Sequence, residues 1–139
     1  MYESLSPLFY NGEEEDRVNP TDNTLFTPKE ALRHGNLYKN QYVGYKNYVP
    51  KIKAPKNKKE TLMHEIMSLE FTCLDLALVI YVYPTNKEYI ALYKRYMSQL
   101  EELKRNYDKE YGSICSKNGV LKDGYFDYVT SPSPWLGVY

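Results

Sequence analysis

The sequence predicts a mainly α protein: an antiparallel two-helix hairpin, one short capped helix, and extended aromatic arms at the N- and C-terminal ends. Two patterns predict this fold. From residue 60 to residue 111, apolar residues recur in steps of three and four, which places them on one face of a helix. Pro84 interrupts the pattern, because proline cannot continue a helix and forces the preceding residue out of helical geometry. The stretch is therefore divided into two helices that fold back on each other.

Length and charge restrict the class of protein. A chain of 139 residues has the length of about one domain. Two helices alone cannot bury a large core. The 18 basic and 18 acidic residues balance, so no net charge attracts the chain to nucleic acid or to an anionic membrane. The sequence has no signal-peptide pattern and no apolar run of the roughly 20 residues that a membrane span needs. Sixteen tyrosines suit surfaces that become buried in a complex, although AT-rich codon usage would also produce them.

The N-terminal part contains one strongly marked helix. Residues 1–24 have no apolar period and are interpreted as a disordered or adaptable arm. Thr27 is the predicted N-cap of a short helix, Pro28 its first residue, Glu30 its partner in a capping box, and Gly35 its left-handed stop. About seven residues do not hold a helix in water, so this helix must dock on another part of the protein. The side chains expected to dock it are Leu25, Phe26, Ala31 and Leu32.

The segment that joins this helix to the hairpin is expected to be extended. Residues 25–50 are predicted to combine the short helix with a tyrosine-rich stretch that has no period and drapes over a partner surface. Its tyrosines are Tyr38, Tyr42, Tyr45 and Tyr48. Residues 51–59 are rich in lysine and are interpreted as a solvated basic linker, with contact to phosphate as the alternative.

The hairpin is predicted over residues 60–111. The apolar face of its first helix consists of Leu62, Ile66, Leu69, Cys73, Ala77 and Ile80, and that of its second helix of Tyr89, Leu92, Tyr96, Leu100, Leu103, Tyr107 and Tyr111. Thr85 and Glu88 are predicted to form a capping box that starts the second helix. Gly112 is predicted to end it.

The first helix is apolar on a second side as well. Met63, Met67, Leu74 and Leu78 form a second stripe, and a helix with two apolar stripes packs against its hairpin mate and also against something else. The second stripe therefore favours an obligate partner or self-association, with coverage by the chain's own N-terminal arm as the alternative. Asp75, within this apolar stretch, is expected to be a buried carboxylate that pairs with a lysine or arginine across the hairpin and fixes its register.

The tail, residues 112–139, alternates proline and aromatic residues and is expected to be an extended, polyproline-like strand. No constellation for catalysis, and none for a cofactor or metal, is found in the sequence. His34 lies where a cation suits the end of the short helix, and His64 lacks a second histidine one turn later. Cys73 is expected to behave as a small buried hydrophobe and Cys115 as a free loop thiol, too few for a disulfide framework. The chain is thus expected to be made in a reducing cytosol.

Four segments resemble the spore coat protein CotJB family of endospore-forming bacteria. They are 71–81, with the string F-x-x-x-D-L-x-L, the hinge 84–86, the string Y-x-x-x-Y-G at 107–112, and P-x-P-W at 132–135. In the family, tryptophans stand where this chain has Phe126, Tyr128 and Ser133, and a histidine stands where it has Tyr83. Upstream, residues 26–42 are similar to the small CotJA protein, so that the chain resembles a natural CotJA–CotJB fusion.

This resemblance implies a structural or adaptor component of the spore coat, made in the cytoplasm of the mother cell and deposited in the coat during sporulation. The implied partner is a manganese-catalase-like, CotJC-like coat protein, with self-association also expected and with no nucleic acid or membrane involved. The alternative is a small cytosolic helical adaptor or regulator unrelated to sporulation. The predicted partner-binding residues are Phe26, Leu32, Leu37, Tyr38, Met63, Met67, Leu74, Leu78, Phe126, Tyr128 and Trp135.

Overall fold

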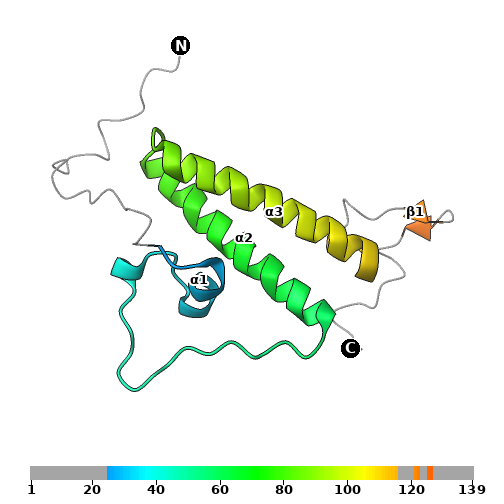
Figure 1. Cartoon of the computed structure of the whole chain (residues 1–139), viewed down its shortest axis with the longest axis horizontal. Helices are drawn as coiled ribbons and strands as arrows, with labels where there is room; N and C mark the ends of the chain where they lie inside the picture. The colour runs from blue at the N-terminus through cyan, green and yellow to red at the C-terminus, as the bar shows by residue number, and fades with distance from the viewer. Residues whose placement is uncertain (1–24, 116–120, 123–124, 127–139) are drawn as a thin grey trace, which may run out of the picture.

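A computed structural model, which describes residues 25–115, 121–122 and 125–126, confirms the mainly helical fold. Two long helices, α2 (Lys58–Val82) and α3 (Lys87–Tyr111), lie side by side and antiparallel, and the short helix α1 (Pro28–His34) lies against α2 (Figure 1). A 3-10 turn, η3 (Lys39–Gln41), follows α1. Two strands of two residues each, β1 (Leu121–Lys122) and β2 (Tyr125–Phe126), form an antiparallel pair after the hairpin.

The two predicted apolar faces meet in the hairpin. Ile66, Leu69 and Cys73 of α2 are buried against Leu100 and Tyr107 of α3. Burial of each such side chain stabilises the fold by roughly 1.5–3 kcal/mol, so these contacts hold the two helices together. Surface ion pairs join the same helices, with Lys58 bound to Glu110 at 3.1 Å and Lys104 bound to Glu70; pairs of this exposed kind add little to stability.

Gly112 ends α3 as predicted, but the N-cap of α3 differs from the prediction. Asn86, not Thr85, is the N-cap of α3: its Oδ1 accepts hydrogen bonds from the N–H groups of Glu88 at 3.0 Å and Tyr89 at 3.2 Å. The predicted Thr85–Glu88 capping box is therefore wrong. Asparagine is the stronger N-cap of the two residues, and one asparagine oxygen here reaches two of the helix's unpaired N–H groups. An asparagine, Asn57, also caps α2, which begins at Lys58.

Replacing Asn86 by alanine is expected to lower the free energy of unfolding by about 1 kcal/mol, because two N–H groups at the start of α3 lose their acceptor. Thr85→Ala, one residue away and exposed, serves as the matched control and should leave stability within about 0.5 kcal/mol of the parent. Urea unfolding followed by circular dichroism measures both changes. Equal losses in the two variants would contradict the assignment of the cap.

Helix α1 is held as the sequence predicts at both ends. Thr27 and Glu30 form the capping box, and hydrogen bonds from Thr27 lower the pKa of the Glu30 carboxyl. Gly35 adopts the left-handed conformation at φ 70°, which favours glycine, and ends the helix. The stabilisation from Glu30 is complete above the ordinary glutamate pKa and is lost as the pH falls through the lowered value.

The short helix docks on α2 and on the start of α3. Ala31 and Leu37 are buried in one cluster with Leu76 and Tyr89, and Leu25 and Phe26 pack against this cluster. The chain on the two sides of α1 also pairs: the N–H of Phe26 donates to the carbonyl oxygen of Leu37 at 2.8 Å, and Leu25 bridges Tyr38. The segment around α1 is thus a closed loop resting on α2.

Asp75 fastens this loop to α2. Its Oδ2 accepts a hydrogen bond from the backbone N–H of Leu37 at 3.0 Å. The prediction that it pairs with a lysine or arginine across the hairpin is therefore wrong. The carboxylate fixes the position of the short-helix segment, 38 residues away in sequence, rather than the register of α2 against α3.

The remaining segments agree only in part with the sequence analysis. Tyr38 and Tyr42 are partly buried beside α1, whereas Tyr45 and Tyr48 are exposed, as is the linker over residues 51–59. At 125–126 the chain pairs with 121–122 in a β-hairpin instead of forming the expected polyproline-like strand. The N-terminal arm and the rest of the tail lie outside the described residues.

Candidate interaction surface

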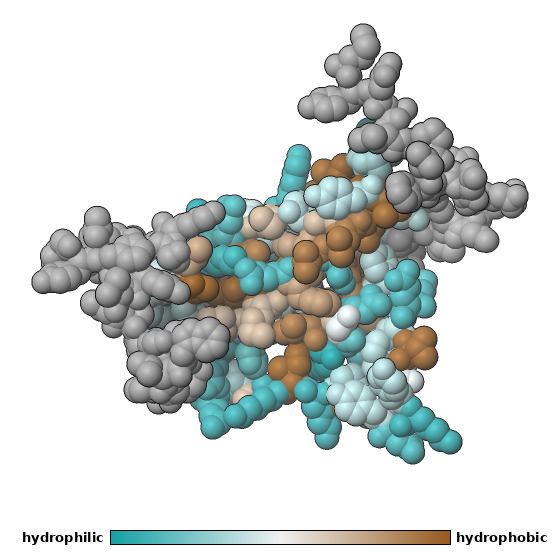
Figure 2. Space-filling model, turned by 180° about the vertical axis from the view of Figure 1, so that it is seen from behind, coloured by the Kyte–Doolittle hydropathy of each residue, from teal (hydrophilic) through white to brown (hydrophobic). Residues whose placement is uncertain are grey.

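The second stripe predicted on α2 lies largely at the surface. Met67 is 46% exposed, Leu74 61% and Leu78 56%, and the stripe continues to the end of the helix with Tyr81 at 83% and Val82 at 55%. The fourth predicted member, Met63, instead packs against the core between α2 and α3. Within the described part of the chain, nothing covers this face. A band of hydrophobic residues crosses the back of the hairpin (Figure 2).

The outer face of α3 is polar, unlike the exposed apolar face of α2. Its exposed residues are largely charged or polar, with Lys94, Arg95, Glu101, Glu102 and Arg105 among them. A charged outer face remains in contact with water, whereas an exposed apolar face is typical of a surface that becomes covered. The hairpin therefore offers α2, and not α3, for association.

The two carboxylates that flank the α2 stripe are already engaged within the chain. Glu70 is bound to Lys104 of α3, and Asp75 accepts from the N–H of Leu37. From Met67 to Val82 no other charged residue occurs. The stripe is therefore electrostatically neutral along its whole exposed length.

The predicted binding residues near α1 lie within the chain's own packing. Leu37 is 1% exposed, and Phe26 and Tyr38 are partly buried beside it. Burial is the main cause that raises the pKa of the Tyr38 phenol, with Tyr89 and Asp75 adding to the effect. Leu32 is also partly buried. Phe26, Leu37 and Tyr38 belong to the packing that docks α1. The role of all four residues in binding a partner stays a prediction.

The predicted tail anchors lie mostly beyond the described residues. Phe126 is in β2, whereas Tyr128 and Trp135 fall outside the described part of the chain. The stripe on α2 is thus the predicted surface whose geometry the structure provides.

One concave feature was not predicted from the sequence. A groove of about 630 Å³ opens between α1, α2 and α3, with Leu69 and Leu103 among its apolar residues and Lys29, Glu65 and Glu102 among its charged ones. Both Lys29 and Glu65 line the groove, and the Nζ of Lys29 lies 3.9 Å from the Oε1 of Glu65. The groove exists only because α1 docks against the hairpin. No local pattern in the sequence predicts which surface of the hairpin contacts α1.

The histidines, cysteines and carboxylates of the described residues are the candidates for metal binding or reactive chemistry. The described residues contain no group of three or more histidine, cysteine, aspartate or glutamate residues placed to hold a metal ion. The ring of His34, in the last turn of α1, is stacked on Phe26 at 4.6 Å and lies 4.5 Å from Tyr42, centroid to centroid. Cys73 is buried and burial raises the pKa of its thiol, whereas Cys115 is exposed, as predicted for both.

Among the described helices, none has the length and apolar character needed to cross a membrane.

Comparison with known proteins gives one match. Residues 60–136, more than half of the chain, match the model of a protein family described as CotJB protein. The match covers α2 except its first two residues, the hinge and α3, and extends to Leu136 in the tail. It does not include residues 25–50, which carry α1. No curated protein and no solved structure matches the chain.

Proposed function

Because the chain belongs to the CotJB protein family, we propose that it is a non-catalytic structural component of the bacterial spore coat that assembles with a manganese-catalase-like coat protein. Membership in the family suggests a spore coat protein. In this proposal the chain is made in the cytoplasm of the mother cell and deposited in the coat during sporulation. It supplies contact surfaces to the assembly, and its catalase-like partner supplies the metal site.

The observation that carries the proposal is the neutral apolar stripe on α2, exposed from Met67 to Val82. A stripe of this length is costly to leave in water, since each exposed aliphatic side chain forgoes roughly 1.5–3 kcal/mol of burial. Such a surface supports a role in protein–protein contact more than one in chemistry. The stripe does not by itself select the partner.

The N-terminal extension fits the same proposal. Residues 26–42 resemble CotJA, and we propose that the chain is a natural fusion of a CotJA-like segment with the CotJB unit. What supports this is the docking of the segment: Leu37 packs on Leu76, and its N–H is bound by Asp75, which lies inside the matched region. The two units would then enter the coat as one body.

Co-expression of the tagged full-length chain with a manganese-catalase-like coat protein tests the proposal. We expect a stoichiometric complex on size-exclusion light scattering, with manganese in the complex and none in the chain purified by itself. Trp135→Ala is expected to weaken capture about tenfold or more, because aromatic anchors of this kind dominate interfaces. Lys94→Ala, which shortens an exposed side chain on the charged outer face of α3, is the control and should leave capture unchanged.

Two results would contradict the proposal. Failure of the two proteins to co-purify at micromolar concentrations would remove the adaptor role and favour a helical adaptor for some other protein. Turnover of a substrate by the chain in the absence of any partner would remove the non-catalytic role.

A further inference from the structure

We propose that α2 of one copy packs antiparallel on α2 of a second copy, so that their exposed stripes form one seam with Leu74 on the twofold axis. The two hairpins then make a four-helix assembly with α2 and its counterpart inside and the charged faces of α3 outside. This inference uses the surface that carries the proposed function, but it does not depend on the catalase-like partner. It needs only the chain itself.

The spacing of the stripe is that of a coiled-coil seam. Met67, Phe71, Leu74, Leu78 and Tyr81 follow one another at intervals of four, three, four and three residues. Phe71 lies at the edge of the stripe, partly buried against the cluster around α1, and the other four are exposed. This alternation has a mean period of 3.5, which keeps a narrow line of side chains facing one partner helix along its length. Globular cores usually have a broader stripe. The exposed face of α2 is therefore matched to another helix.

Because the seam carries no unpaired charge, the helix that packs on α2 can be α2 of a second copy of the chain. A face that carries charge repels its own copy, because a twofold axis brings equal charges together. Here Glu70 is bound to Lys104 and Asp75 is bound to the N–H of Leu37, both within one chain. Two copies can thus approach without bringing an unpaired carboxylate into the seam.

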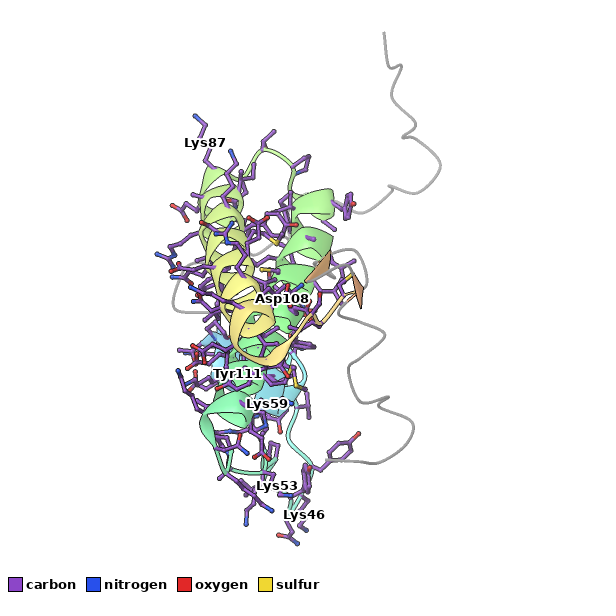
Figure 3. The ribbon with its side chains drawn as sticks, turned by 90° about the vertical axis from the view of Figure 1, so that its right-hand side faces the viewer. Lys46, Lys53, Lys59, Lys87, Asp108 and Tyr111 are labelled. Atoms are coloured by element: carbon purple, nitrogen blue, oxygen red, sulfur yellow. The ribbon has the colours of Figure 1, made fainter. Side chains whose placement is uncertain are left out.

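The distribution of lysines selects the antiparallel arrangement. Six lysines occur between residues 46 and 59, just before and at the start of α2, and Lys46, Lys53 and Lys59 lie at one end of the molecule (Figure 3). A parallel pair would place both basic ends side by side. In the antiparallel pair, the two Lys59 positions lie about 45 Å apart along the helices, at 1.5 Å per residue, far beyond the screening length of about 8 Å.

The stripe is also centred on one residue. Met67 precedes Leu74 by seven positions and Tyr81 follows it by seven, so an axis at Leu74 brings Met67 opposite Tyr81 of the second copy. Contacts of methionine sulfur with an aromatic ring are favourable. The seam comprises about five side chains from each copy and is smaller than a standard interface of about 800 Å² per partner. We therefore expect a dissociation constant in roughly the micromolar range.

The oligomeric state of the purified full-length chain tests the seam. Sedimentation velocity between roughly 1 and 200 µM, chosen to bracket a micromolar constant, should show a monomer–dimer equilibrium. Leu74→Glu is expected to raise the dissociation constant at least about tenfold, since the two copies would bring their carboxylates together at the axis. Val49→Glu, which puts the same charge at a similarly exposed apolar residue before the linker, should leave the dissociation constant unchanged. Circular dichroism checks that each variant is folded.

Cysteine cross-linking tests the direction of the helices, in a Cys115→Ser background so that no other exposed thiol among the described residues reacts. Leu74→Cys should give a disulfide-linked dimer on mild oxidation. Met67→Cys should not cross-link to itself, but should cross-link to Tyr81→Cys when the two variants are mixed.

Three results would contradict parts of the proposed dimer. A chain that stays monomeric at the highest concentration removes the dimer, and its stripe would then be covered by its own arm or by a different protein. A dimer that Leu74→Glu leaves intact removes the seam. Self-cross-linking by Met67→Cys removes the antiparallel direction. Because these measurements use the chain by itself, they fail or succeed independently of co-purification with the catalase-like protein.

Discussion

Replacing Leu76 by alanine is expected to lower the free energy of unfolding by about 2–5 kcal/mol. Leu76 of α2 is 0% exposed. It packs with Ala31, Leu37 and Tyr89 in the buried cluster that joins α1 to the hairpin. Removing its three terminal carbons leaves a cavity between three separate segments. The loss should fall towards the upper part of the range if these segments do not collapse into the space.

Leu78→Ala is the matched control, because it makes the same chemical change two residues away on the exposed stripe. In dilute solution its effect should be within about 0.5 kcal/mol of zero. Urea unfolding curves for the parent and both variants give the comparison. Similar losses at the two positions would mean that α1 does not dock over Leu76.

Replacing Asp75 by alanine is expected to cost about 1–3 kcal/mol, since the N–H of Leu37 would lose its acceptor while remaining beside the buried cluster. The effect should be local to the short-helix segment. Hydrogen exchange should therefore become about 10- to 100-fold faster at the amide of Leu37 and within α1, and stay near the parent rate in the middle of α3.

Asp75→Asn separates the hydrogen bond from the charge. The asparagine carbonyl can still accept from Leu37, so this variant should keep most of the protection that alanine loses. If asparagine and alanine accelerated exchange equally, the carboxylate charge rather than its hydrogen bond would hold the segment. If neither accelerated it, Asp75 would not fasten α1 at all.

The hairpin could be predicted because its signals are local. The steps of three and four that place Ile66, Leu69 and Cys73 on one face are properties of a single helix, and Pro84 ends that helix wherever the chain goes next. The same holds for α1, whose capping box and Gly35 lie within nine residues. The existence of the second stripe also followed from spacing within one helix.

The sequence predicted that α1 docks, with Leu25, Phe26 and Ala31 among the docking residues, and the structure agrees. The site on α2 that receives α1 could not be predicted, because this face of α2 includes buried polar residues. Ser68 and Thr72 are 4% and 0% exposed, yet they are polar residues and do not contribute to an apolar stripe. Each hydroxyl donates to a carbonyl of its own helix, Ser68 to His64 at 2.7 Å and Thr72 to Ser68 at 2.9 Å. This arrangement lets a small polar side chain be buried at little cost. For the same reason the partner of Asp75, which depends on that docking, was assigned to the wrong element.

The unequal lengths of the two connections have a consequence for the order in which the chain folds. Only four residues, 83–86, join α2 to α3, so their contacts close a short loop, whereas the segment from the end of η3 to the start of α2 spans residues 42–57. The entropy lost on closing a loop rises with its length, and contacts close in sequence form first. The hairpin therefore has the smaller barrier to formation, and the loop around α1 settles on a surface that already exists. In the reverse direction, we expect α1 to open and close while α2 and α3 stay paired. Amide exchange around Leu37 and Leu76 should then be faster than global unfolding alone would allow.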